Sequence, residues 1–503
     1  MAAERLVGNL ALVSHPGQSR GTAKYWFRDW KVEGEGIVET PEYAAGPIMG
    51  TQYTTHNNVL KLTAQMMPIS RWDNDVVSLQ ILRGRTWKTI ATSRIIAPGW
   101  TAPFRISDWD TTKDASYRVF YQWRTRSGDL REFTWGGTIR RDPVEKSTIV
   151  VAGFTGNHNT RGGVDRGRYD WTKNGLWFPH ADLTANVEKH RPDLLFFSGD
   201  QVYEGASPTG AVRGKGETTM LDYMYKWYLF SWAYRDLTKD IPTITIPDDH
   251  DVFQGNVWGH GGRSTAKDDK GGYVEDAEFV KMVERTQTSH LPDPYDPTPV
   301  GQGIGVYYAP LNIGRISVAI IEDRKFKWGP NGVVPPTDTG RADHVNDPNF
   351  DVKSADVPGA QLLGARQEEF LREWAADWTG ADMKMVVSQT IFGNLATHHG
   401  GNLSYLVADY DSNGWPQSGR ARGCMRCGGA SPSCSAAISI CRRSSNMAST
   451  ASTTRVGRSV CPRSQTSIPA PGTRLAAARS RTIAGLRKCR PTPADSSTAL
   501  AIT

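Results

Sequence analysis

The first 423 residues of this 503-residue chain lack cysteine, and the residues after them lack phenylalanine, tyrosine and tryptophan. All six cysteines lie beyond Gly423, together with eleven Arg, one Lys and a single acid, Asp495. The net charge of this last segment is +11, whereas the net charge of the whole chain is +7. The residues before it therefore sum to 7 minus 11, or −4, and are mildly acidic. The net charge therefore does not indicate a nucleic-acid-binding globular domain, and the chain changes character near Gly423.

The chain also lacks a run of eighteen apolar residues, so we expect no membrane span. Its beginning, MAAERLVGNLALVSHPGQ, has a short apolar stretch that a histidine soon interrupts, which makes it a poor secretory signal. We assign residues 1–49 to an N-terminal extension. The length predicts two to four globular domains, and the sequence leaves their oligomeric state open.

Residues 50–146 contain short segments in which apolar residues alternate with polar ones. Examples are VLKLTA at 59, VVSLQIL at 76 and YRVFYQWR at 117. Alternation in the last segment places Tyr117, Val119 and Tyr121 on one face of a strand. The pattern predicts an all-β sandwich of the immunoglobulin or fibronectin type.

Residues 147–423 follow a different pattern, in which buried strands alternate with helices. The expected strands are TIVVAGF at 148, DLLFFSGD at 193, PTITIPDDHD at 242, GRISVAIIEDR at 314 and MKMVVSQ at 383. The expected helices are ADLTANVEKHR at 181, residues 217–236 and QLLGARQEEFLREWAADW at 361. This order predicts a layered α/β domain with acidic clusters at strand ends, the edge of an open α/β sheet where ligands bind.

Two acidic clusters follow successive strands about fifty residues apart. The first contains Asp200 and Tyr203, and the second is the run Asp248, Asp249, His250 and Asp251. Taken singly, an Asp after Gly is an ordinary turn residue and DDHD an ordinary solvated loop. Together they favour hard cations, and a carboxylate that bridges two metals ~3.5–4 Å apart would support displacement at phosphorus.

Five blocks of the chain resemble a known family. SGDQVYEG resembles the GDxxY motif of alkaline phosphatase D relatives, and PDDHDV resembles their DDHE element. EDRKFK at 322, LLGARQEEFL at 362 and DYDSNGWPQ at 409 resemble further blocks in the same order. Residues 150–420 thus resemble these calcineurin-like metallophosphoesterases. The resemblance implies a metallophosphatase-like αββα sandwich that hydrolyses small phosphate monoesters or diesters, in enzymes that are often exported.

The resemblance also implies roles for individual residues. Asp200 would bridge two metals, Tyr203 would bind one as a phenolate, and Asp249 would bind the other. His250 would be the general acid or a phosphate contact. Arg324 could orient phosphate bidentately, although an Arg after a strand is also typical of a surface ion pair. A phenolate ligand favours Fe(III), here paired with Ca(II), and Mn or Zn are alternatives.

The first strand departs from the family pattern. Relatives commonly place an iron-binding Cys after it, whereas this chain reads VAGFTGNHNT. Phe154 and Thr155 cannot supply a thiolate, so we expect Asn157 or His158 to contribute a ligand instead. The pair His398 and His399 could bind metal or phosphate, or could be structural.

The tail, residues 424–503, has three interpretations. Cys424 and Cys427 have a zinc-ligand spacing, but no second CxxC or His pair follows. An Arg-rich, Ser-rich and Ala-rich tail is also typical of disordered, anion-binding segments. The third interpretation is a frameshift: read in another frame, residues 436–440 permit GDQH, which resembles the GDxH motif that should complete the metal site. The chain as it stands lacks that motif, so the site would be incomplete.

The sequence leaves two rival functions open. The chain could be an inactive remnant or a noncatalytic binding protein that uses its β-sandwich. It could instead bind DNA or RNA through the Arg-rich tail. We expect a phosphoric ester hydrolase without a nucleic-acid partner.

Overall fold

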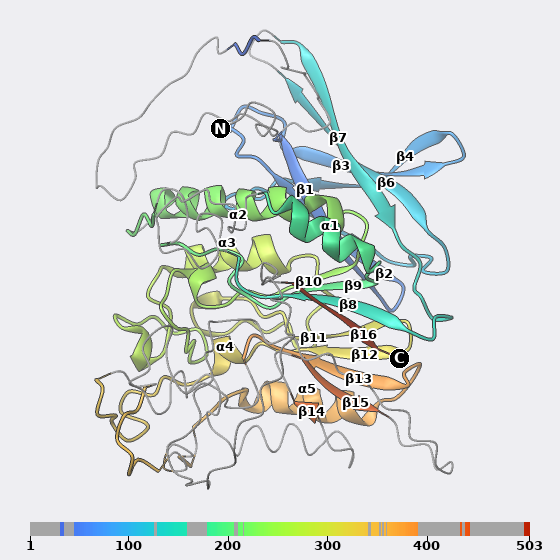
Figure 1. The fold of residues 1–503 in the computed structure, drawn as a ribbon. Coiled ribbons are helices and arrows are strands. Elements are labelled where there is room, and N and C mark those ends of the chain that lie inside the picture. Colours follow the sequence, from blue (N-terminus) through green and yellow to red (C-terminus); the bar gives the residue numbers. More distant parts are fainter. Residues whose placement is uncertain are drawn as a thin grey trace, which may run out of the picture.

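The computed structural model describes most of the N-terminal region and most of the α/β region. The described residues are 31–34, 45–124, 128–157, 179–205, 210–214, 216–340, 344–351, 354, 357–358 and 360–390, with the backbone of 433–434, 438–442 and 497–502. Figure 1 shows the N-terminal strands at one end of the molecule, with helices and two further sheets following beneath them.

The N-terminal strands form two antiparallel sheets. One has the order β1 (Ile48–His56), β2 (Val59–Met66) and β5 (Thr101–Ile106). The other has the order β4 (Thr86–Arg94), β3 (Val76–Arg83), β6 (Ala115–Arg124) and β7 (Leu130–Ile139). Tyr117, Val119 and Tyr121 are buried in one core that both sheets share, which confirms the predicted alternation along β6.

The α/β region begins with three parallel strands joined by helices. These elements are β8 (Ile149–Phe154), α1 (Ala181–Lys189), β9 (Leu194–Phe197), α2 (Glu217–Thr238) and β10 (Thr243–Thr245). Helix α3 (Ala277–Thr288) follows. Helices α1, α2 and α3 bury side chains against the outward-facing residues of β8 and β9, in one apolar cluster.

A second sheet is built from β11 (Ala309–Ile313), β12 (Ile316–Ile320) and β13 (Met383–Val387). Its residues Leu311, Val318 and Met385 share a core with Val151 and Phe196 of the first sheet. Helix α5 (Gly364–Ala376) packs on the other face of this second sheet, and α4 (Asp323–Phe326) follows β12. In Figure 1, α5 and the helices α1 and α2 accordingly lie on opposite sides of the sheets.

Short stretches of the tail add strands to both sheets. β15 (Ile438–Arg442) pairs with β13 and with β14 (Ser433–Cys434), and β16 (Ser497–Ile502) pairs antiparallel with β8. The disorder expected for residues 424–503 stays a prediction, because only the backbone of these short stretches is described. The edges of β8 and β13 offer backbone N–H and C=O groups that any extended segment without proline can pair with, whatever its charge or composition. The rest of the tail, including Cys424 and Cys427, lies outside the described residues.

Helix α2 joins the N-terminal sheets to the α/β region. Its Trp227 donates to Gln65 on β2 at 2.8 Å, and its Tyr228 donates to the backbone of Met66 at 2.9 Å. The helix is rich in aromatic residues because one side faces the strands β8 and β9 and another faces β1. Across the described residues, no helix combines the length and hydrophobicity that a bilayer crossing needs.

Candidate metal centre

The topology brings the two acidic clusters to one edge of the sheet that contains β8, β9 and β10. Strands β9 and β10 are parallel neighbours, with Phe197 opposite Thr245. The chain leaves both strands at their carboxyl ends, so residues 198–205 and 246–253 form adjacent loops. We call these segments the first and second ligand loop.

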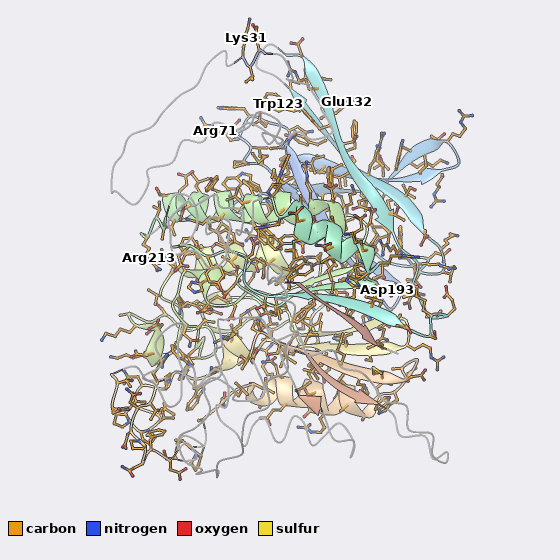
Figure 2. All side chains as sticks on the ribbon, viewed as in Figure 1. Lys31, Arg71, Trp123, Glu132, Asp193 and Arg213 are labelled. Atoms are coloured by element: carbon orange, nitrogen blue, oxygen red, sulfur yellow. The ribbon has the colours of Figure 1, made fainter. Side chains whose placement is uncertain are left out.

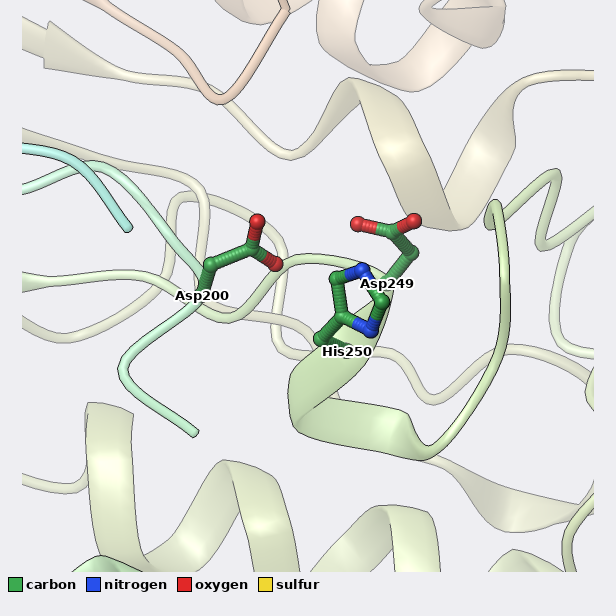
Figure 3. A group of neighbouring side chains, drawn as sticks. All are labelled: Asp200, Asp249 and His250. Carbon is green, nitrogen blue, oxygen red and sulfur yellow. The ribbon is translucent and has the colours of Figure 1, made fainter. Parts of the chain in front are cut away.

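Three side chains of the two ligand loops converge. One oxygen of Asp200, one of Asp249 and one ring nitrogen of His250 lie within 4.8 Å of one another. Figure 3 shows the two carboxylates and the imidazole turned toward a common space. All three side chains are half-buried, and Oδ1 of Asp200 has no hydrogen-bond partner among the described residues. Oxygen and nitrogen donors with a spare acceptor atom fit a cation of the iron, zinc or manganese type.

Tyr203 completes the described part of the cluster. Its hydroxyl donates a hydrogen bond to Asp200, and its ring lies 4.5 Å from the ring of His250. The chain passes close to it at Gly156, which has a φ of 66°, and a Cβ there would lie 3.0 Å from the Tyr203 hydroxyl. A residue other than glycine would therefore be strained at this position and would crowd the phenol.

The carboxylates of the cluster hold their protons more tightly than usual. Burial, followed by the charge of Asp248, raises the pKa of Asp200 to about 7. Burial and the neighbouring Asp200 raise the pKa of Asp249 to about 7, and burial does the same for Asp248 despite the opposing charge of Arg324. Grouped acids that repel one another in the absence of a cation are a physical signature of a functional site.

His250 is held in its cationic form by a carboxylate that sequence reasoning missed. Its Nδ1 lies 2.8 Å from Oε2 of Glu204, whose other oxygen accepts a hydrogen bond from Arg213 at 2.5 Å. Burial opposes the charge on the ring, but the bond to Glu204 and the charges of Asp249 and Asp200 outweigh it and raise the pKa of His250 to about 10. Arg213, labelled in Figure 2, comes from the segment between β9 and α2.

Arg324 reaches the cluster through Asp248. Its guanidinium pairs with the Asp248 carboxylate at 2.8 Å and 3.2 Å and donates to Asn256 at 2.7 Å. This ion pair is buried and includes one hydrogen bond, from Nη2 of Arg324 to Oδ2 of Asp248, unlike the surface ion pair that was one sequence alternative. Asp248 received no role from the sequence, since nothing in the run DDHD says which acid faces the arginine.

Asn157 lies beside the first ligand loop. Its backbone N–H donates to the carbonyl of Asp200 at 2.8 Å, and its amide oxygen accepts a hydrogen bond from Tyr234 at 3.3 Å. The structure thus brings this predicted ligand close to Asp200 but engages its oxygen with a tyrosine of α2. His158, His398 and His399 lie outside the described residues.

The fold and the cluster define a class of protein: an α/β protein with a cation-binding set of carboxylate and imidazole groups at the carboxyl ends of parallel strands. Residues 170–424 match the profile of the PhoD-like phosphatase family, over just over half of the chain. The chain belongs to the PhoD-like phosphatase family. A search of the curated proteins found no match. Membership implies a metallophosphatase-like fold and a phosphatase, and phosphatases of this family depend on metal ions.

Proposed function

We propose that the chain is a metal-dependent phosphoric ester hydrolase of the alkaline phosphatase D type. Its substrates would be small phosphate monoesters or diesters. The observation that carries the proposal is the convergence of Asp200, Asp249 and His250 in a chain that belongs to a phosphatase family. Family membership alone would allow a remnant without a site, so this convergence matters.

A metal-ion site fits the residues of the cluster. Asp200 would bridge two ions, with Tyr203 on one and Asp249 on the other, and Asn157 and His158 would supply further ligands. The combination of phenolate and carboxylate oxygens favours Fe(III) with Ca(II), and Mn or Zn would be alternatives. When bound, the ions would supply Lewis-acid polarisation of the phosphoryl group and lower the pKa of a water nucleophile.

Two side chains of the protein would act on charges near the reacting phosphate. His250 would meet the phosphate and donate a proton toward the leaving oxygen, because Glu204 and the neighbouring acids favour its cationic form. Arg324 would act mainly by neutralising Asp248, since its donors are directed at that carboxylate and at Asn256. Direct contact of Arg324 with phosphate stays a prediction.

The domain arrangement that we propose follows the change of pattern along the sequence. Residues 50–146 would form an immunoglobulin- or fibronectin-like sandwich, after an extension of residues 1–49. Residues 147–423 would form an αββα metallophosphatase domain, supported by the core that the two central sheets share and by the helices on their outer faces. The chain would be exported, as enzymes of this family often are.

The tail, residues 424–503, would be an out-of-frame ending that replaces the last metal-binding motif. The chain as it stands would then bind metal weakly. The nucleotide sequence around the codon for Gly423 tests this directly: a one- or two-base correction should open a frame that encodes GDQH. A frame without such a correction would exclude this explanation of the tail.

Hydrolysis assays test the proposed function. The full chain and a frame-restored chain are assayed with p-nitrophenyl phosphate and bis-p-nitrophenyl phosphate, each with added Fe, Ca, Mn or Zn. We expect metal-dependent hydrolysis that Asp200→Ala abolishes and that Asp236→Ala, an exposed change on α2, leaves intact. If neither chain hydrolyses either ester with any metal, the chain is an inactive remnant and the proposal fails.

A further inference from the structure

A single buried carboxylate ties the two ligand loops together. Asp251 of the second loop is fully buried and accepts four hydrogen bonds. Its Oδ2 accepts the N–H groups of Asp200 and Asp248, both at 2.8 Å. Its Oδ1 accepts the N–H of Val202 and Nε2 of Gln287, both at 3.0 Å. All the acceptor capacity of this carboxylate is thus spent on holding backbone and one amide side chain.

Two buried glutamines close the arrangement from the other side. Gln201 of the first loop donates to the carbonyl of Ile246 in the second loop at 2.9 Å, and its oxygen accepts the N–H of Gly199. Gln287 of α3 lies between them, because it accepts a hydrogen bond from Gln201 at 2.9 Å and donates to Asp251. The first loop therefore donates hydrogen bonds to the second, and Gln287 of α3 forms a hydrogen bond with both. We call Asp251, Gln201 and Gln287 the loop clamp.

The loop clamp bears directly on the conformation of a proposed ligand. Asp200 has a φ of 56°, a left-handed conformation that is uncommon for residues other than glycine, although aspartate adopts it more readily than most. The hydrogen bond from its N–H to Asp251 helps to hold the backbone in this conformation.

We propose that the loop clamp, rather than the bound metal, sets the spacing of the two ligand loops. This inference rests on the metal site of the proposed function. Its residues are positioning residues: they contact backbone and one another, and they act on the metal through Asp200 and Asp249. A metal that enters a site already held in place does not have to order the loops, so affinity is higher than in a site that forms on binding.

The clamp is tested first without metal. In the metal-free full chain, the backbone amides of peptides that cover 198–205 and 246–253 should exchange slowly with deuterium, as measured by mass spectrometry. Asp251→Asn sets an NH₂ group against backbone donors, and Gln287→Met removes the bracing amide. Both should accelerate exchange in these peptides. Gln65→Met removes an equally buried amide from β2, away from the ligand loops, and should leave them protected.

The second readout is Mn(II) affinity, followed by the electron paramagnetic resonance signal of free Mn(II). Asp251→Asn and Gln287→Met should weaken binding by about 10- to 100-fold, the range found when groups that orient metal ligands are lost. Gln65→Met should leave the affinity unchanged. The proposal is overturned if the metal-free wild type exchanges rapidly in both peptides, or if both clamp variants bind Mn(II) like wild type. Mn(II) binding without hydrolysis of either ester would instead count against the proposed function alone.

Discussion

Asp200→Asn should stabilise the metal-free protein while it weakens the proposed metal site. The pKa of Asp200 is about 7 in the folded protein, whereas its ordinary value is 3.8. The ionised carboxylate is therefore less stable in the folded state than in the unfolded state, and its ionisation opposes folding. Three pKa units correspond to about 4 kcal/mol, and because the side chain is partly exposed we halve this to roughly 2 kcal/mol. Asparagine tolerates the left-handed backbone at this position and keeps an oxygen for the Tyr203 hydroxyl, so the substitution introduces little strain.

The sign of the pH dependence makes this prediction specific. A carboxyl group whose folded pKa is raised contributes its stability below pH 3.8, and that contribution is lost as the pH rises toward 7. The wild type should therefore lose stability relative to Asp200→Asn between these two values. The difference should be near zero at pH 4 and complete at pH 8.

Thermal unfolding in a metal chelator, followed by circular dichroism from pH 4 to 8, measures the effect. At pH 8 we expect the variant to melt roughly 4–8 °C higher, the shift that 2 kcal/mol gives in a domain of 150–250 residues. Asp236→Asn, which changes an exposed acid paired with Lys239, should show no such trend. The reasoning is refuted if Asp200→Asn melts lower than wild type at pH 8, or if the difference does not depend on pH.

Three further substitutions have defined outcomes. Burial lowers the pKa of His290 to about 3, so wild type should lose about 2 kcal/mol as the pH falls from 6.5 to 5, when the unfolded ring takes up a proton. His290→Gln keeps a donor for the carbonyl of Thr243 and should lose that slope in urea unfolding at the two pH values. Tyr203→Phe should lower Mn(II) affinity at least tenfold in calorimetric titration and leave the melting temperature of the metal-free protein within ~2 °C, since its ring contact with a neighbouring imidazole is kept. Arg324→Lys keeps the charge but loses the guanidinium hydrogen bonds to Asp248 and Asn256, and should cost about 1–2 kcal/mol in urea unfolding.

The position of the proposed ligands could be predicted from the sequence because it depends on strand order. The strands that end at Phe197 and Thr245 are apolar and are separated by a helical segment, which is the pattern of parallel neighbours. Parallel neighbours release their chains at the same edge, so Asp200 and His250 had to lie close together. No side-chain detail was needed for that step.

The partners of these ligands could not be predicted in the same way. Glu204 follows Tyr203 directly, yet only the turn of the first ligand loop aims it at His250. Gln287 lies on a helix 86 residues away from Gln201, and its hydrogen bond depends on how α3 packs against the loops. The sequence offers one indication of this contact, a glutamine on the buried face of the amphipathic helix α3. That pattern does not indicate which residue the glutamine contacts.

The tail combines a composition typical of disorder with short described stretches that pair with sheet edges. Its composition predicts disorder, because it offers few large apolar side chains to bury. Strand pairing uses the backbone, and β15 and β16 meet the free edges of β13 and β8. Composition therefore indicates whether a segment can form its own core, but not whether an existing sheet edge can accept it.

Under the proposed frameshift, restoring the reading frame after Gly423 should raise metal affinity without changing the ligand loops. Every member of the loop clamp lies between Gln201 and Gln287, well before the altered segment, so the first and second ligand loops are held independently of the tail. A restored GDQH would add ligands to a site that is already in place. Mn(II) affinity should then rise while hydrogen exchange of residues 198–205 and 246–253 in the metal-free chain stays the same. Slower exchange in the restored chain would mean that the missing motif helps to build the loops, and the clamp would not be sufficient.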